Sequence, residues 1–315
     1  MASIEVNGIT VEYDVQGEGE PLLLVMGLGA QLIDWPADFV DLLVAEGFQV
    51  IRFDNRDAGL STEFDWVPPS RARSAAALLA RRRPKAGYLI ADMAADAAGL
   101  LRALGAGPAH VVGVSMGGMI AQTMAIEHPD SVMSLTSIMS NTGNNRHGLP
   151  HRKVLVKLSR LASPTIEDAE ETSLTVFRLV AGPAADEELF RQQTRAGLER
   201  SFRPFGVLRQ TAALVASPDR TSGLHRISVP SLVIHGLADP LVRPSGGTAT
   251  ARAIPGSRLL MFPEMGHDMP RIRWPEMVTA ITQNASRADR SAMNTQSGMK
   301  SNTLPERSLS MNAGS

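Results

Sequence analysis

A serine between two glycines is the part of this sequence best suited to covalent chemistry. The stretch Gly-Val-Ser-Met-Gly occupies residues 113–117, between an apolar run typical of a buried strand and a helical pattern that begins at Met116. A serine at such a strand-to-helix corner adopts a strained backbone conformation that presents its hydroxyl above the sheet. We predict that Gly113 and Gly117, which let strand and helix pack closely, form this nucleophile elbow around Ser115.

A base and an acid that could activate Ser115 follow it in the chain. A serine hydroxyl is a weak nucleophile, so it needs a general base, and the base needs a carboxylate to orient it. At this kind of corner the expected chain order is serine, then Asp or Glu, then histidine. Of the histidines after Ser115, only His267 lies beyond the last predicted strand, and Asp239 follows the strand before it. Because the carboxyl ends of parallel strands share one edge of a sheet, we predict a catalytic triad of Ser115, Asp239 and His267.

Each of these assignments has a structural alternative. Asp239 precedes a proline and could serve only as the first residue of an Asx turn. His267 could be a surface histidine. Its neighbour Asp268 is predicted to point away from the imidazole, as a surface or loop-capping residue. His235 ends a strand, and we predict a buried histidine with satisfied hydrogen bonds there.

Two backbone amides are candidates for an oxyanion hole. Met116 directly follows the nucleophile and opens a helix, whose dipole also favours an anion. Leu28 lies between Gly27 and Gly29 in the loop after the first parallel strand, and glycines allow close approach of the backbone. A turn that only reverses the chain would also use these two glycines, so this alternative stays open for Leu28.

The composition excludes several other kinds of chemistry. The chain has 315 residues and no cysteine, which excludes a thiolate nucleophile, disulfides and cysteine-bound zinc or iron–sulfur sites. Its 31 basic and 32 acidic residues leave a net charge of −1, which provides no general attraction to nucleic acid or to an acidic membrane. We therefore expect a small, roughly neutral substrate and no nucleic acid or membrane as partner. The chemistry of the predicted triad needs no metal or cofactor, and a small-molecule ester is its expected substrate. The amino terminus lacks the features of a signal peptide, which predicts a cytoplasmic protein.

One local stretch departs from this neutral balance. Between Asp65 and Asp92 there are six basic residues and no acidic one. We interpret the stretch, residues 71–85, as a solvated loop and helix face. Affinity for an anionic ligand is the alternative.

Short apolar runs alternate with helical patterns along most of the chain. The alternation predicts a doubly wound α/β sheet, and Asn7-Gly8 between two short β-rich runs predicts an antiparallel hairpin at its edge. The predicted strands are 3–6, 10–15, 21–26, 48–53, 109–114, 132–139, 231–235 and 258–262, and the predicted helices are 38–45, 90–104, 116–127 and 245–253.

Two segments break the alternation and define the predicted domains. Between 141 and 226 charged helical patterns replace it, which predicts a helical insertion. Residues 285–315 are rich in Ser, Asn, Thr and Met with little apolar periodicity, and we predict a disordered tail. The α/β core is then 1–140 together with 227–284.

These motifs together resemble the α/β-hydrolase fold superfamily, and within it bacterial carboxylesterases similar to aclacinomycin methylesterase. The stretches that carry the resemblance are 22–27, 35–36, 51–61, 110–118, 230–239 and 263–270. The resemblance implies a mostly parallel twisted sheet of about eight strands with helices on both faces, and a helical cap at 141–226. It also implies the Ser115–Asp239–His267 triad, with Leu28 and Met116 as oxyanion donors. Most relatives have His-Gly where this chain has Met26-Gly27, although methylesterase-like members share Met-Gly.

The expected activity is hydrolysis of carboxylic esters through an acyl-enzyme on Ser115, as in a carboxylesterase, methylesterase or lactonase. A cofactor-free haloperoxidase-like perhydrolase and a carbon–carbon bond hydrolase use the same triad and remain alternatives. A ligand-binding protein that has kept the fold without catalysis is an alternative of another class.

Overall fold

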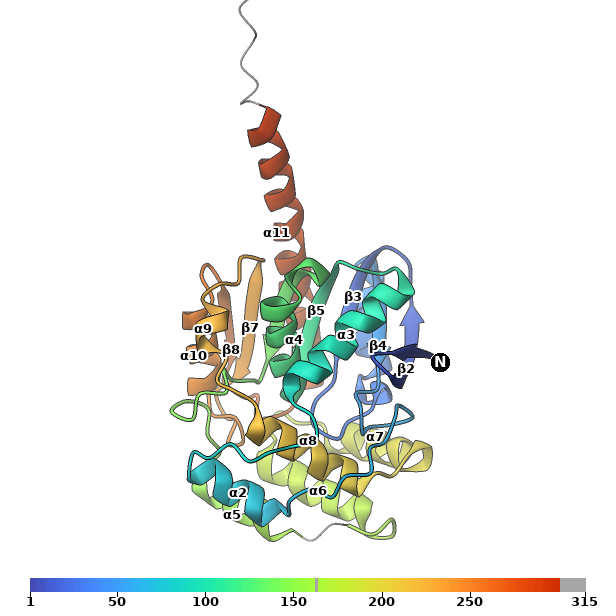
Figure 1. Ribbon diagram of the computed structural model, residues 1–315, viewed down its shortest axis with the longest axis vertical. Helices are drawn as coiled ribbons and strands as arrows, with labels where there is room; N and C mark the ends of the chain where they lie inside the picture. Colours follow the sequence, from blue (N-terminus) through green and yellow to red (C-terminus); the bar gives the residue numbers. More distant parts are fainter. Residues whose placement is uncertain (162–163, 301–315) are drawn as a thin grey trace, which may run out of the picture.

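An eight-stranded sheet forms the centre of the molecule (Figure 1). The computed structural model describes residues 1–161 and 164–300. In the order β1-β2-β4-β3-β5-β6-β7-β8, β1 pairs with β2 and β2 with β4 in antiparallel fashion, and every other pair is parallel. The strands are β1 (Ala2–Val6), β2 (Ile9–Gln16), β3 (Glu20–Val25), β4 (Phe48–Phe53), β5 (Ala109–Val114), β6 (Val132–Ile138), β7 (Ser231–Gly236) and β8 (Arg258–Phe262).

The predicted sheet and its antiparallel edge are confirmed, and each strand end lies within one residue of its predicted position. The edge hairpin turns at Asn7 and Gly8, which both have positive φ angles. Such a turn matches the twist of the flanking strands, which is why this residue pair indicated a hairpin.

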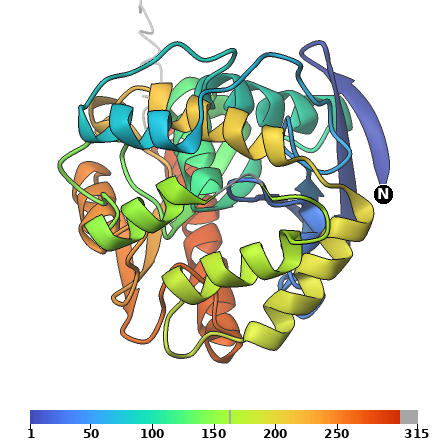
Figure 2. The same cartoon turned by 90° about the horizontal axis from the view of Figure 1, so that it is seen from below.

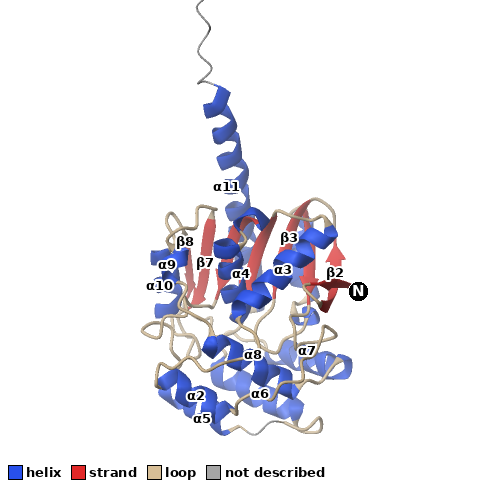
Figure 3. Ribbon diagram, in the orientation of Figure 1, coloured by secondary structure: helices blue, strands red, loops and turns tan. Residues whose placement is uncertain are grey.

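Helices cover both faces of the sheet, as Figure 3 shows. Along β3, Leu23 and Val25 belong to one buried apolar cluster, and Leu22 and Leu24 belong to the other. This alternation arises because successive side chains of a strand point to opposite faces. The first cluster contains residues of α3 (Ile90–Leu104), α4 (Met116–Glu127) and α10 (Ser245–Ala253); the second contains residues of α1 (Ala37–Ala45) and α11 (Trp274–Lys300).

A separate layer of helices lies across one end of the sheet (Figures 1 and 2). We call this the helical layer. It consists of α2 (Arg71–Leu79), α5 (Arg152–Arg160), α6 (Ala169–Val180), α7 (Glu187–Arg200) and α8 (Pro204–Ala216). Helix α2 comes from the basic stretch upstream of the predicted insertion, and it joins the layer by packing against α5 and α8. The short helix α9 (Thr221–Leu224) packs on α4 and α10, back at the sheet. The domain boundaries at 140/141 and 226/227 stay predictions.

The carboxyl-terminal helix differs from our expectation. We predicted disorder from residue 285, but α11 continues to Lys300 and leaves the body of the molecule at the end opposite the helical layer (Figure 1). Ala285 is buried together with Met277, Val278 and Ile281, at the spacing of one helix face. We did not predict this buried helix face because we gave the polar composition of residues 285–315 more weight than the helical spacing of the few apolar residues. The rest of the predicted tail, 301–315, lies outside the described residues.

Within the described part of the chain, every helix is too short or too polar to cross a membrane.

The packing of α11 makes a prediction about stability. Ile281 is 2% exposed against the sheet, whereas Gln283 lies on the exposed face of the same helix. Ile281→Ala should lower the free energy of unfolding by about 2–5 kcal/mol, because it leaves a cavity in the core. Gln283→Ala should change it by no more than about 0.5 kcal/mol. Urea denaturation measures both values, and equal effects would contradict the position of this helix.

Candidate active site

Ser115 forms a sharp corner between β5 and α4. Its φ and ψ angles are 54° and −118°, a conformation that residues with a side chain rarely adopt. Both flanking glycines are required by close packing. A Cβ atom on Gly113 would lie 2.1 Å from the carbonyl oxygen of Gly117, and one on Gly117 would lie 2.0 Å from the carbonyl oxygen of Val25. Main chain cannot move aside easily, so the corner depends on these two glycines.

The structure brings Ser115, His267 and Asp239 together from three distant parts of the chain. His267 Nε2 lies 2.9 Å from Ser115 Oγ, and His267 Nδ1 lies 2.8 Å from Asp239 Oδ2. The carboxylate accepts a hydrogen bond from Nδ1–H, which leaves the unprotonated Nε2 able to accept the serine proton. The arrangement can therefore activate the hydroxyl as a nucleophile.

Asp239 makes the contacts expected for both of the alternatives that the sequence left open. Its Oδ1 atom accepts hydrogen bonds from the amides of Leu241 and Val242, each at 2.8 Å, and so forms the turn after β7. Its Oδ2 atom faces His267. The turn therefore fixes one oxygen and aims the other at the imidazole, and the whole side chain is buried.

His235 stabilises the same turn through a hydrogen bond to its main chain. It is buried, and its Nε2 donates to the carbonyl oxygen of Val242 at 2.7 Å. Burial lowers the pKa of His235, which favours the neutral ring. Our prediction of satisfied hydrogen bonds holds for Nε2 only. Among the described residues Nδ1 has no hydrogen-bond partner, because the ring edge packs tightly against Gly247.

Asp268 ties the loop that carries His267 to the helical layer. Its Oδ1 atom accepts hydrogen bonds from the amides of Gly182, just after α6, and Gly266. The amide of His267 donates to the carbonyl oxygen of Val180, the last residue of α6, at 2.8 Å. Burial raises the pKa of Asp268. Of the two predicted roles, the structure shows loop capping; the side chain is not on the surface.

The two predicted oxyanion donors lie on segments next to Ser115. Met116 is the first residue of α4, and the first amides of a helix have no acceptor within the helix. A Cβ atom on Gly27 would lie 3.3 Å from Ser115 Cβ and 3.9 Å from Ser115 Oγ, so the chain enters Leu28 beside the serine. The amide of Gly29 donates to Gln210 Oε1 of α8 at 2.7 Å, which holds this loop in place.

Two buried aspartates after β4 have structural roles that we did not predict. Asp54 accepts a hydrogen bond from the amide of Leu32 and forms an ion pair with Arg200 of α7 at 2.7 Å. Asp57 forms an ion pair with Arg209 of α8 at 2.9 Å and accepts a hydrogen bond from the Tyr88 hydroxyl. These contacts attach the helical layer to the loops beside Ser115. Their only sequence signal is the polar run 54–57 directly after a strand.

Asp34 carries a perturbed carboxyl group in the same region. Its pKa is raised to about 6, mainly by burial and also by the nearby charge of Asp54, while the hydrogen bond from the Gln31 amide and the charge of Arg200 oppose the shift. The structure thus stabilises the protonated form of Asp34 relative to the unfolded chain.

This pKa makes a prediction about stability and pH. From its ordinary value of 3.8 up to about 6, the unfolded chain gives up the Asp34 proton while the folded chain keeps it. This contribution to stability therefore falls as the pH rises through that window. Asp34→Asn removes the effect, so the stability of the variant relative to wild type should increase by up to about 3 kcal/mol between about pH 4 and about pH 7. Urea denaturation across this range measures the difference, and a difference that does not vary with pH would contradict the assignment.

Comparisons with known proteins agree with this architecture. A model of the alpha/beta hydrolase fold family matches residues 20–178. The chain is 29% identical over 284 residues to rhodomycin D methylesterase DnrP of Streptomyces peucetius, covering 83% of this chain and 89% of the methylesterase. It is 30% identical over 267 residues to a 2-hydroxy-6-oxononadienedioate/2-hydroxy-6-oxononatrienedioate hydrolase of Burkholderia vietnamiensis, covering 82% and 85%. A solved thermophilic esterase from Thermogutta terrifontis superposes with a TM-score of 0.67 at 24% identity, covering 91% of this chain and 99% of the esterase.

Proposed function

Because this chain belongs to the α/β-hydrolase fold family, we propose that it is a serine hydrolase that cleaves carboxylic esters. The observation that carries the proposal is the imidazole of His267, which lies within hydrogen-bond distance of both Ser115 and Asp239. Similarity to a methylesterase supports an ester as the substrate. The proposed substrate is a small-molecule ester.

The proposed reaction proceeds through an acyl-enzyme. Ser115 Oγ attacks the ester carbonyl carbon while its proton passes to His267 Nε2, and Asp239 stabilises the resulting imidazolium. The tetrahedral intermediate collapses, the bond to the alcohol oxygen breaks, and His267 gives its proton to the leaving alcohol. Water then attacks the acyl-enzyme with His267 as base, which releases the acid and restores Ser115.

The proposed oxyanion hole consists of the amides of Met116 and Leu28. Negative charge develops on the carbonyl oxygen as Ser115 attacks, and amides that are already in place stabilise it without reorganisation. The position of Met116 at the start of α4 adds the favourable end of the helix dipole. Support for Leu28 comes from Gly27, beside the serine, and from the bond between Gly29 and Gln210.

We propose that the helical layer is the cap that sets substrate choice. Its end at α6 contacts the His267 loop, and α7 and α8 are tied to the loops after β3 and β4. A lactone is an internal ester and suits the same chemistry. Cleavage of a carbon–carbon bond is the second candidate, because one relative is the Burkholderia hydrolase described above. Turnover of a 2-hydroxy-6-oxo-dienoate with no turnover of esters would favour that candidate.

Removal of the nucleophile is the direct test. Ser115→Ala should lower kcat for short-chain p-nitrophenyl esters by at least about 10³-fold, because it removes the acyl acceptor. A fluorophosphonate probe should label wild type and not this variant. Ser140→Ala is the matched control: Ser140 is buried nearby, and its hydroxyl has no hydrogen-bond partner among the described residues. Labelling of Ser115→Ala, or its full activity, would overturn the proposal.

The two neighbouring aspartates make a paired prediction about the orienting acid. Asp239→Asn should keep the turn after β7 but favour the wrong tautomer of His267, and kcat should fall by about 10³–10⁴-fold. Asp268→Asn can still accept its two amide hydrogen bonds, so kcat should stay within about tenfold of wild type. Steady-state kinetics on one p-nitrophenyl ester measures both. If Asp268→Asn had the larger effect, Asp239 would not be the orienting acid.

A further inference from the structure

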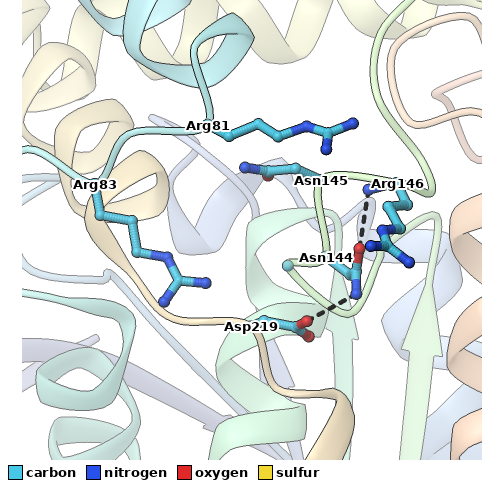
Figure 4. A pocket seen from close by; sticks show the side chains of 7 residues that line it. Arg81, Arg83, Asn144, Asn145, Arg146 and Asp219 are labelled. Carbon is cyan, nitrogen blue, oxygen red and sulfur yellow. Dashed lines mark hydrogen bonds between the residues drawn. The ribbon is translucent and has the colours of Figure 1, made fainter.

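A cavity of about 470 Å³ lies away from the three residues of the proposed triad. One wall consists of Arg81 and Arg83, in the segment after α2, and the opposite wall is the loop 143–146 after β6. Figure 4 shows the side chains of Arg81 and Arg83 directed toward the side on which Asn145 and Arg146 lie. Asp219, just after α8, completes the lining.

The cavity carries an excess of positive charge. Three arginines, Arg81, Arg83 and Arg146, line it, and within the described residues none of them forms an ion pair. Asp219 is the single carboxylate, and both its oxygens already accept hydrogen bonds. Oδ1 accepts from the amide and hydroxyl of Thr221, and Oδ2 accepts from Asn144 Nδ2 at 2.8 Å.

A fourth guanidinium, that of Arg220, lies behind the cavity. Arg220 is 8% exposed, donates to Gln122 Oε1 and to the carbonyl oxygen of Asn141, and has no carboxylate within ion-pair distance among the described residues. A Cβ atom on Gly143 would lie 3.2 Å from Arg220 Nη1, so this buried cation lies against the main chain that lines the cavity. Burial lowers its pKa to about 10, the charge of neighbouring Asp219 opposes this shift, and the group stays charged at neutral pH. A buried charge without an ion-pair partner is costly, and an anion in the cavity would offset more of that cost than Asp219 does alone.

Both walls are held by local hydrogen bonds. Beyond α2, the amides of Arg81 and Arg82 donate to the carbonyl oxygens of Leu78 and Ala77, and Arg81 has a φ angle of 54°. On the opposite wall, the amides of Gly143 and Arg146 donate to the side chains of Asn141 and Asn144. The backbone that carries the arginines is thus ordered without a ligand, which reduces the entropy lost on binding.

We propose that this cavity binds a phosphate group, either as the inorganic ion or on a small organic molecule. A carboxylate has two oxygens in one plane and is satisfied by one guanidinium. Phosphate has three or four oxygens in a tetrahedral arrangement and up to two negative charges, which suits several guanidinium groups carried by different segments. The basic stretch of the sequence is then one half of a binding site, and its other half comes from the loop after β6.

Isothermal titration calorimetry with inorganic phosphate, at constant ionic strength held with chloride, tests the proposal. Wild type should bind one phosphate per chain, and Arg81→Gln, Arg83→Gln and Arg146→Gln should each weaken the affinity by about tenfold. Arg82→Gln is the matched control, because Arg82 lies between two of these residues but does not line the cavity. Its affinity should stay within about twofold of wild type.

Two further titrations separate this site from other sources of binding. Ser115→Ala should bind phosphate as tightly as wild type, whereas loss of binding would place the ion at the proposed active site instead. Malonate should bind more weakly than phosphate, and tighter binding of malonate would overturn the assignment to phosphate. Absence of saturable binding, or equal weakening by Arg82→Gln and Arg83→Gln, would overturn the proposal itself.

Discussion

The contact between the end of β5 and the start of α4 is the constraint on which the rest of the site depends. At Gly113 and Gly117 the two elements approach so closely that a single methyl group would collide with main-chain carbonyl oxygens. This approach forces Ser115 into a positive φ angle and leaves its hydroxyl at the edge of the sheet. The packing of β5 against α4 stabilises this strained backbone. Every residue of β5 is buried, which anchors the strand side of the corner.

The other two polar groups reach this edge on loops, which need their own supports. The turn after β7 is formed by Asp239 itself and is braced by His235 through Val242. The His267 loop is attached to α6 through Asp268 and through its own amide. Asp239 therefore orients the imidazole, whereas Asp268 and the His267 amide connect its loop to the helical layer, so a movement of α6 would displace His267.

Buried ion pairs hold the helical layer against the opposite side of the site. Arg200 with Asp54 and Arg209 with Asp57 are largely removed from water, and such pairs gain less free energy than their charges suggest because both ions lose hydration. Their hydrogen bonds to backbone amides recover part of that cost and require one specific arrangement of the loops. These ion pairs therefore fix the position of α7 and α8 more than they stabilise the fold, because a helix shifted by one turn would leave a buried charge without its partner.

Local patterns in the sequence predicted the sheet, its hairpin edge and the glycines around Ser115, because strand periodicity and turn residues lie within a few residues of one another. The order of Ser115, Asp239 and His267 along the chain predicted which side chains would meet there. Interactions between distant residues decided the rest. Helix α2 joins the helical layer by packing against α5 and α8, and the face of α11 that contains Ala285 belongs to the apolar cluster on one side of the sheet. Arg209 is 152 residues from Asp57 in the chain, and the cavity arginines Arg81 and Arg146 come from separate loops. No local sequence pattern predicts which distant charged residues come together. The energy of a buried charge depends on the surroundings that desolvate it and on the partner that compensates it, and both are set by the tertiary structure.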